Sequence, residues 1–192
     1  AGLATGGAVA YLVVEGAGRL TGSPAADRRQ TGSHELDPAQ MPVTIWLFDD
    51  VPALDSAEHQ VSVDGQTWTR SALAQLPSAT EFEATLDCTN GWYAQASWRG
   101  VSLAELLDPA RVRGSHSIRV TSATGYARTF PVRDVDFLWL ATELNGRELT
   151  AGHGAPVRLV APGRRGFWWV KWVASVELSN DPWWWQPPFP TQ

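Results

Sequence analysis

Residues 86–92, Leu-Asp-Cys-Thr-Asn-Gly-Trp, contain the only cysteine of this 192-residue chain. Before it, polar and apolar residues alternate from Glu81 to Cys88, which predicts a strand with Cys88 on its apolar face. The Asn90-Gly91 pair then predicts a turn directly after the strand. A cysteine at the core-facing end of a strand is either an inert core residue or a sulfur placed for chemistry. The remainder of the chain has to decide between these two interpretations.

The composition indicates one globular domain that does not bind nucleic acid. Hydrophobic residues make up 44% of the chain and charged residues 18%, and the length is sufficient to bury a core. A net charge of −5 and a pI near 5.3 argue against the basic face that binding to a phosphate backbone requires. One cysteine allows no internal disulfide. Six of the eleven tryptophans lie between Trp168 and Trp185, so this segment supplies large rigid surfaces.

Residues 1–41 are expected to form an N-terminal extension to a domain over residues 42–192. Residues 1–14 are an uncharged apolar run, shorter than the ~20 residues of a membrane span. We interpret this run as the end of a membrane helix or, alternatively, as a buried N-terminal segment. Residues 15–41 are rich in Gly, Ser, Asp, Arg and Pro without periodicity, which predicts an extended arm over the surface.

Short strands dominate the rest of the sequence. Ser102 and Glu105 form a capping box that predicts the start of a helix, and Asp64-Gly65 predicts a hairpin turn. These signals together predict an α+β domain with mixed, strand-rich sheets and short helices. The expected strands cover residues 59–63, 67–69, 81–88, 117–122, 126–132, 156–161 and 167–178, and the expected helices cover residues 71–76, 102–107 and 134–143.

The longest expected strand, residues 167–178, is apolar on both faces, which is typical of a strand at the centre of a sheet. Lys171 lies within it among aromatic residues. Burying an ammonium group is costly unless an anion meets it. The sequence therefore predicts an anion beside Lys171.

More cations surround two glycine turns between Gly152 and Trp172. Backbone amides at such turns, with guanidinium and ammonium groups beside them, form a pocket for phosphate or a similar anion, although cations near a sheet are often only solvated. His153 and Cys88 also permit a thiol hydrolase in which the histidine activates the sulfur. No Cys-x-x-Cys or His-x-x-x-His spacing occurs, which argues against a zinc site. The candidate anion-binding residues are His153, Arg158, Arg164, Arg165 and Lys171.

Five spaced segments resemble the molybdopterin-binding domain of the sulfite oxidase family. They are EATLDCTNGW (residues 83–92), WRGVSL (98–103), LNGREL (144–149), HGAPVR (153–158) and VKW (170–172). The resemblance runs from about Pro42 to Gln192. It implies a sulfite oxidase-type molybdopterin-binding fold of the α+β class, which binds one molybdenum through a pyranopterin dithiolene and the thiolate of Cys88. A soft thiolate suits such a sulfur-rich metal site.

The resemblance also implies which residues contact the molybdopterin cofactor. His153, Arg158 and Lys171 correspond to residues that hold the cofactor and its phosphate, which would explain the buried lysine. The backbone groups of Trp169 and Val170 are expected beside them. Positions near cofactor contacts in relatives are Thr44 and Ser122.

The chain departs from sulfite-oxidising members of the family directly after Cys88. Those members carry an arginine there that receives the anionic substrate, whereas residues 89–93 are Thr-Asn-Gly-Trp-Tyr and the segment up to Trp98 is shorter. We therefore expect an aromatic substrate wall formed by Trp92, Tyr93 and Trp98. Such a wall favours a small neutral or sulfoxide-like substrate over a dianion.

The chain is more similar to stand-alone bacterial members of the family, such as the catalytic subunit of the periplasmic methionine-sulfoxide reductase. This likeness implies oxygen-atom transfer at molybdenum, with electrons exchanged with a cytochrome b-like membrane partner or with fused membrane helices. It also implies a location at the periplasmic or extracellular face of a membrane, with the full-length protein anchored there.

Three other classes of protein stay open on the sequence. A Trp-rich extracellular binding module, for example for carbohydrate, would use Trp183, Trp184 and Trp185 without a catalytic metal. A cysteine hydrolase would use Cys88 as its nucleophile. A degenerate member of the family would keep the fold and bind no cofactor.

Overall fold

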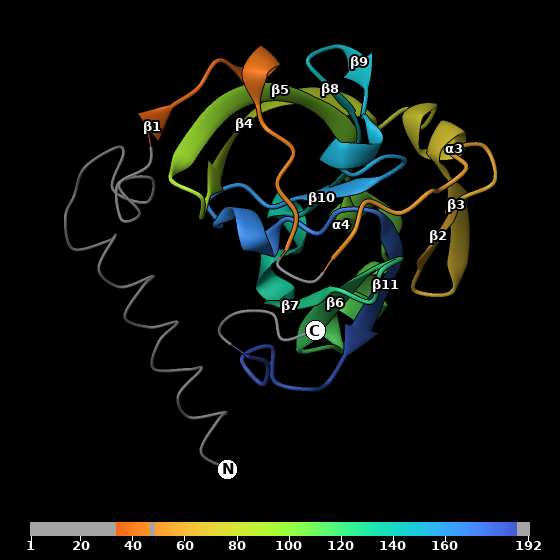
Figure 1. Ribbon diagram of the computed structural model, residues 1–192. Coiled ribbons are helices and arrows are strands. Elements are labelled where there is room, and N and C mark those ends of the chain that lie inside the picture. Colours follow the sequence, from red (N-terminus) through yellow and green to blue (C-terminus); the bar gives the residue numbers. More distant parts are fainter. Residues whose placement is uncertain (1–33, 47–48, 188–192) are drawn as a thin grey trace.

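Two β-sheets form the body of the molecule, one above the other in the view of Figure 1. The computed structural model describes residues 34–46 and 49–187. The upper sheet has six strands and the lower sheet five, and the helices between them are short. This arrangement confirms the predicted α+β class with mixed sheets.

The six-stranded sheet is built on the hairpin that carries Cys88. β4 (Thr80–Cys88) and β5 (Trp92–Ser102) pair antiparallel, with Cys88 opposite Trp92 at the turn. Gly91 in this turn has φ 88°, a conformation that favours glycine. β5 also pairs with two further strands of the sheet. The other strands are β1 (His34–Glu35), β8 (Trp139–Leu144), β9 (Arg147–Glu148) and β10 (Arg158–Val160).

The five-stranded sheet has the order β3-β2-β11-β6-β7. Its edge strand β7 is covered by a side chain of the C-terminal segment: Thr129 donates its backbone N–H to Oε1 of Gln186, and its carbonyl accepts from Nε2 of the same residue. The side-chain amide thus takes the place of a neighbouring strand. The strands are β2 (Gln60–Val63), β3 (Gln66–Thr69), β6 (Ser117–Ser122), β7 (Ala127–Pro131) and β11 (Val173–Ser179).

Side-chain caps start the three described α-helices. The predicted capping box holds in part, since Ser102 accepts a hydrogen bond from Ala104 N–H at the start of α4. A further helix, which the sequence did not predict, follows at once: Asp108 caps it, and Pro109 lies in its first turn. The helices are α3 (Arg70–Ala74), α4 (Leu103–Leu106) and α5 (Pro109–Arg113), and the 3₁₀ helices are η1 (Pro38–Gln40), η2 (Val132–Phe137), η3 (Ala151–His153) and η4 (Gly166–Trp168).

The helix predicted over residues 134–143 is wrong. The chain forms the short 3₁₀ helix η2 and then the strand β8, which pairs with β5 on one side and β10 on the other. Leu140, Ala141 and Thr142 are all buried. A strand enclosed on both faces shows no alternation, so the sequence pattern did not distinguish it from a helix.

The single long strand predicted over residues 167–178 is also wrong in its first half. Only Val173–Ser179 pairs in the sheet, as β11. Gly166–Trp168 forms η4, and Trp172 has a φ of 53°, which breaks an extended chain directly before β11. Lys171 therefore lies in a connection between the sheets, and not on a central strand.

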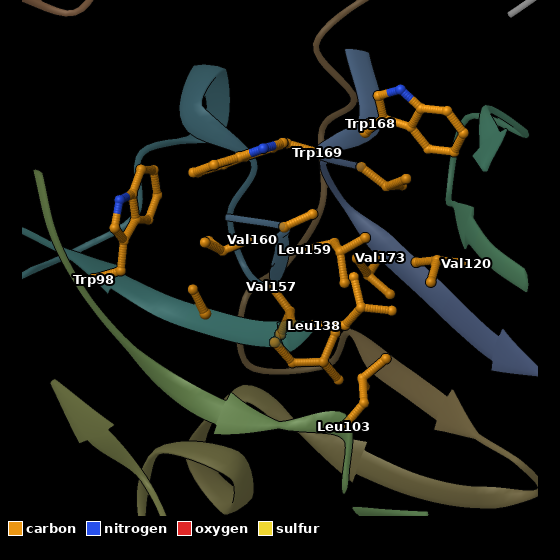
Figure 2. Packing of buried hydrophobic residues seen from close by; sticks show 14 of the residues in the cluster. Trp98, Leu103, Val120, Leu138, Val157, Leu159, Val160, Trp168, Trp169 and Val173 are labelled. Atoms are coloured by element: carbon orange, nitrogen blue, oxygen red, sulfur yellow. The ribbon is translucent and has the colours of Figure 1, made fainter. Parts of the chain in front are cut away.

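A continuous hydrophobic core fills the space between the sheets (Figure 2). Trp168 and Trp169 are neighbours in sequence but project to opposite sides of their segment. Trp169 packs edge-on against Trp98, with ring centroids 5.5 Å apart, and Trp168 packs against Phe130. Within residues 34–46 and 49–187, no helix is long and apolar enough to cross a membrane. Residues 1–14 lie outside the described part of the chain.

Candidate functional site

A pocket with a volume of about 290 Å³ opens at the turn end of β4. Five parts of the chain line it: residues 44–46 with Asp49, the end of β4 with Thr89 and Asn90, the end of β6 with Tyr126, Arg158 of β10, and residues between Gly166 and Trp172. Cys88 and Lys171 both line this pocket, although 82 residues separate them in the sequence. The pocket therefore brings together the two groups that the sequence singled out.

Cys88 is a free thiol that is 7% exposed and faces the pocket. The backbone N–H of Asn90 donates to its Sγ at 3.5 Å, and Thr44 Oγ1 lies 3.7 Å from the same sulfur. The sulfur thus accepts one backbone hydrogen bond and has a hydroxyl within reach.

Arg158 on β10 is a buried cation with unused hydrogen-bonding capacity. Its residue is 3% exposed, and its guanidinium lies 5.3 Å from the ring of Trp98 and 5.6 Å from that of Trp169. Nη1 donates to the carbonyl of His153 at 3.1 Å, while Nε has no hydrogen-bond partner. Burial lowers the pKa of Arg158 to about 10. A desolvated guanidinium with a free donor at a pocket wall is suited to an anion.

Lys171 is the second cation of the pocket. Its Nζ donates to the carbonyl of Thr44 at 2.6 Å and to that of Gly152 at 2.5 Å. Burial, reinforced by the nearby charge of Arg158, lowers the pKa of Lys171 to about 7. An ammonium has three donors, so one N–H remains for a further acceptor. A bound anion would restore the charge that burial disfavours.

His153 lies beside these cations but does not line the pocket. Its Nε2 is 3.1 Å from the carbonyl of Met41, which can only accept, so Nε2 carries a proton. Nδ1 lies 2.8 Å from Thr150 Oγ1. Burial lowers the pKa of His153, and the charges of Arg158 and Lys171 lower it further. Because both ring nitrogens are engaged, neither is available to activate Cys88, which speaks against the cysteine hydrolase.

Most of the predicted cofactor-binding residues meet at this pocket. Val170 does not line it: its carbonyl accepts from the N–H of Leu159 at 2.7 Å, which joins it to β10. The predicted residues that line the pocket are Thr44, Cys88, Ser122, Arg158, Trp169 and Lys171.

The three residues predicted as the substrate wall do not line the pocket. Tyr93 follows Trp92 and so points to the opposite face of the hairpin from Cys88, where its hydroxyl donates to Glu35 at 3.3 Å. Trp92 is 5% exposed, within the core. Trp98 is fully buried and donates its indole N–H to the carbonyl of Ala84 at 3.2 Å.

Other side chains, not singled out in the sequence, form the rest of the wall. Trp46 and Phe167 both line the pocket, and Phe167 lies in η4, where the sequence predicted the first half of a long strand. Asp49 adds a carboxylate, which accepts from Thr124 Oγ1 at 3.0 Å. Tyr126 donates its hydroxyl to the carbonyl of Phe167, and burial raises the pKa of Tyr126 above its ordinary range. Trp46 lies in an apolar run, residues 43–48, that ends at Asp49. This run was the feature of the sequence from which Trp46 could have been chosen as a candidate.

A pocket lined by a buried thiol and two desolvated cations is typical of a protein that binds an anionic group. The chain belongs to the oxidoreductase molybdopterin binding domain family, whose model matches residues 48–185. This confirms the family predicted from the sequence, its sulfite oxidase-type fold and its molybdopterin cofactor with molybdenum.

Known relatives agree with this assignment. Sulfite oxidase of Gallus gallus is 31% identical over 173 residues, which cover 68% of this chain and 37% of that protein. The NADPH nitrate reductase of Fusarium oxysporum is 28% identical over 97 residues, covering 45% of this chain and 11% of that protein. The crystal structure of the sulfane dehydrogenase SoxCD from Paracoccus pantotrophus has a TM-score of 0.60 and 25% identity, covering 68% of this chain and 40% of that one. The chain thus spans well under half the length of these relatives.

The residues of the pocket fit a molybdopterin cofactor. Cys88 offers one soft sulfur donor, and Arg158, whose Nε has no hydrogen-bond partner, lines the same pocket as Lys171. No cluster of three or more His, Cys, Asp or Glu side chains able to hold a metal ion occurs within residues 34–46 and 49–187. The fit rests on one cysteine and on the cations that would meet the phosphate.

Proposed function

We propose that this chain is the cofactor-bearing domain of an oxidoreductase that transfers an oxygen atom to or from a small neutral or sulfoxide-like substrate. The observation that carries the proposal is that the buried Cys88 thiol lines the same pocket as Arg158 and Lys171. When bound, the molybdenum cofactor supplies the two-electron oxygen-atom chemistry, and the protein supplies binding and electrostatics.

The chain's own residues would hold the cofactor from two directions. Cys88 would ligate molybdenum, with its thiolate stabilised by Asn90 N–H and the hydroxyl of Thr44. Arg158 and Lys171 would bind the pterin phosphate through the donors they leave unused. Trp169 would close the wall between the two groups.

The character of the pocket supports a substrate without a net negative charge. We propose Trp46 and Phe167 as its aromatic wall, in place of the three residues expected from the sequence. Asp49 contributes a carboxylate, which repels a dianion such as sulfite. Of the described residues that line the pocket, only Arg158 and Lys171 are cationic, and the cofactor phosphate would use both.

We also propose that electrons are exchanged with a membrane-bound redox partner, and that the domain lies at the periplasmic or extracellular face. Oxygen-atom transfer leaves the cofactor two electrons away from its starting state, so a redox partner must restore it. The apolar run at residues 1–14 supports a position beside a membrane. Fractionation of the full-length protein would test this placement, and recovery in the cytosolic fraction would contradict it.

The cofactor assignment is tested by elemental and pterin analysis of protein expressed with an active cofactor pathway. Wild-type protein should carry molybdenum and pterin, whereas Cys88→Ser should lose most of the molybdenum and retain part of the pterin through Arg158 and Lys171. Ala96→Ser is a matched control, because it also places a hydroxyl in the buried face of the β4–β5 hairpin but outside the pocket. Equal molybdenum in wild type and Cys88→Ser would refute ligation by this cysteine.

The substrate class is tested on the molybdenum-loaded protein with an artificial electron donor or acceptor. We expect reduction of small sulfoxides and little oxidation of sulfite. Sulfite turnover that exceeds sulfoxide turnover would overturn the substrate proposal and leave the cofactor assignment intact.

A further inference from the structure

In the view of Figure 1, the orange segment Met41–Trp46 runs from the upper sheet toward the lower sheet, and it belongs to no strand. We call these six residues the strap. Thr44 and Trp46 of the strap line the pocket, and Thr44 Oγ1 lies 3.7 Å from Cys88 Sγ. The strap therefore lies against the sulfur that would bind the metal.

Two side chains at and beside the pocket hold the strap in place. His153 Nε2 donates to the carbonyl of Met41 at 3.1 Å, and Lys171 Nζ donates to the carbonyl of Thr44 at 2.6 Å. Because the strap belongs to no β-ladder, these bonds depend on two side chains that can rotate away. One of the two, Lys171, is also a residue that the cofactor phosphate would engage.

Hydrophobic burial seats the two ends of the strap but not its middle. Met41 belongs to the core, and Trp46 packs against it with its ring centroid 6.4 Å from that of Tyr126. Between them, Val43 is 52% exposed and Ile45 is 45% exposed, so the middle of the strap lies on the surface. Segments with few buried apolar contacts and no backbone ladder are those that open locally at low free-energy cost.

The middle of the strap is seated against a glycine. A Cβ added at Gly152 would lie 2.4 Å from Cγ2 and 2.8 Å from Cγ1 of Val43. These separations are shorter than any van der Waals contact, and Val43 Cβ would lie 3.2 Å away, so a larger residue at position 152 requires Val43 to shift and strains the closed strap. The fit also shows that η3 and the strap are packed directly together.

We propose that the strap is a lid, which must lift for the cofactor to reach Cys88 and then closes behind it to slow its loss. Lys171 connects the two functions, because two of its donors hold carbonyls of the strap and of η3 while the third stays available for the phosphate. Closure and cofactor retention therefore favour each other. The identity of the occupant rests on the proposed function, but the opening of the strap does not.

Alkylation of Cys88 measures this opening directly, because the chain has no other cysteine. In cofactor-free protein, Gly152→Ala should make alkylation by iodoacetamide about tenfold faster, as ~1.4 kcal/mol of strain on the closed strap would produce. This substitution changes no charge near the sulfur. Gly114→Ala is the matched control, since its Cβ would meet only Ala110 and Arg111 carbonyls at an ordinary 3.6 Å, away from the pocket.

A second substitution identifies the clash as the cause. Val43→Ala removes both methyl groups that Ala at 152 would strike, so Gly152→Ala combined with Val43→Ala should alkylate at nearly the rate of Val43→Ala alone. Unchanged alkylation in Gly152→Ala, or no recovery in the double variant, would overturn the lid.

A measurement on the wild-type protein covers the case in which Gly152→Ala does not fold. If the strap opens locally, the alkylation rate of Cys88 should hardly change at low urea and should rise steeply only near global unfolding. A rate that follows global unfolding over the whole urea range would show that the strap does not open by itself, and would refute the proposal.

A last experiment, on the cofactor-loaded protein, distinguishes failure of the lid from failure of the proposed function. Cofactor-loaded Gly152→Ala should release pterin about tenfold faster than the wild type, because the same ~1.4 kcal/mol of strain acts on the closed strap. Fluorescence of the oxidised pterin after dilution measures this release. If wild-type protein binds no molybdopterin while the alkylation results hold, the proposed function fails and the movable strap stands. If alkylation contradicts the lid while pterin is bound, only the lid fails.

Discussion

Cys88 Sγ and Thr44 Oγ1 lie 3.7 Å apart at the pocket, yet the segments that carry them are fixed in opposite ways. Behind Cys88, Asp87 forms a parallel backbone bridge with Arg165 and an ion pair with its Nε at 3.5 Å. Thr44 belongs to the strap, which rotatable side chains hold. The pocket thus has a floor held by backbone pairing and a cover, the strap, held by side chains.

Gly166 completes the floor. A Cβ added there would lie 3.2 Å from the carbonyl oxygen of Asp87 and 3.3 Å from Cα of Cys88. These neighbours are backbone atoms of a paired strand, and they cannot move aside as the side chain of Val43 can. The four predictions below test whether floor and cover respond differently, beginning with the largest expected effect.

Arg158→Met should weaken cofactor retention about 10- to 100-fold, because a hydrogen bond to a charged group contributes ~1.5–3 kcal/mol. The free energy of unfolding of the cofactor-free protein should change little, because a buried cation is replaced by an apolar side chain of similar length. Pterin titration and urea unfolding provide the two measurements. Arg119→Met, on the exposed face of β6, should change neither. Equal retention in both variants would remove Arg158 from the site.

Gly166→Ala should lower the free energy of unfolding by ~1–3 kcal/mol, since overpacking against fixed backbone strains the native state. Gly152→Ala should lower the free energy of unfolding much less, because the strap can shift away from the added methyl group. Urea denaturation of the two cofactor-free variants makes the comparison. A larger loss of stability in Gly152→Ala would invert our assignment of floor and cover.

The stability of the cofactor-free protein should depend on the ionisation of Lys171. Its pKa of about 7 in the folded protein lies below its ordinary value of 10.5, so between these values the unfolded chain binds more protons. The free energy of unfolding should therefore rise with pH above 7, by at most ~1.4 kcal/mol per pH unit. Lys171→Met should lose this rise between pH 7 and 9. Parallel pH profiles of the two proteins would contradict the shifted pKa.

Thr44→Val should have the smallest effect, below ~1 kcal/mol on the free energy of unfolding, because a single long contact to sulfur is lost. Thr44→Ser keeps the hydroxyl and should match the wild type. Thermal unfolding of the cofactor-free proteins is sufficient to compare them. A loss as large as that of Gly166→Ala would mean that the strap is part of the rigid floor.

Local signals in the sequence were sufficient for the floor. The alternation from Glu81 to Cys88 and the Asn90-Gly91 turn predicted β4 and the position of the sulfur, and both are observed. The spaced motifs predicted that Arg158 and Lys171 would meet Cys88. These features depend on residues close in sequence or on motifs that act as a unit.

The cover and the substrate wall were not predictable in this way. Phe167 reaches the pocket because Gly166 allows a 3₁₀ turn against Cys88, whereas an apolar run of this kind reads as a buried strand. Trp98 has the expected type and spacing, but it packs behind Arg158 in the core. Tertiary packing decides which aromatic residue lines the pocket, and such packing produces no periodic pattern in the sequence. The extent of the domain, residues 42–192, stays a prediction.

The bonds between Gln186 and Thr129 also bear on how copies of this protein behave together. An open edge strand offers unpaired amide and carbonyl groups to any other chain and is a common origin of aggregation. On β7, one glutamine side chain occupies such a pair of groups, at a position where a foreign strand would otherwise add. A strand that adds to β7 at this position would first have to displace the side chain of Gln186.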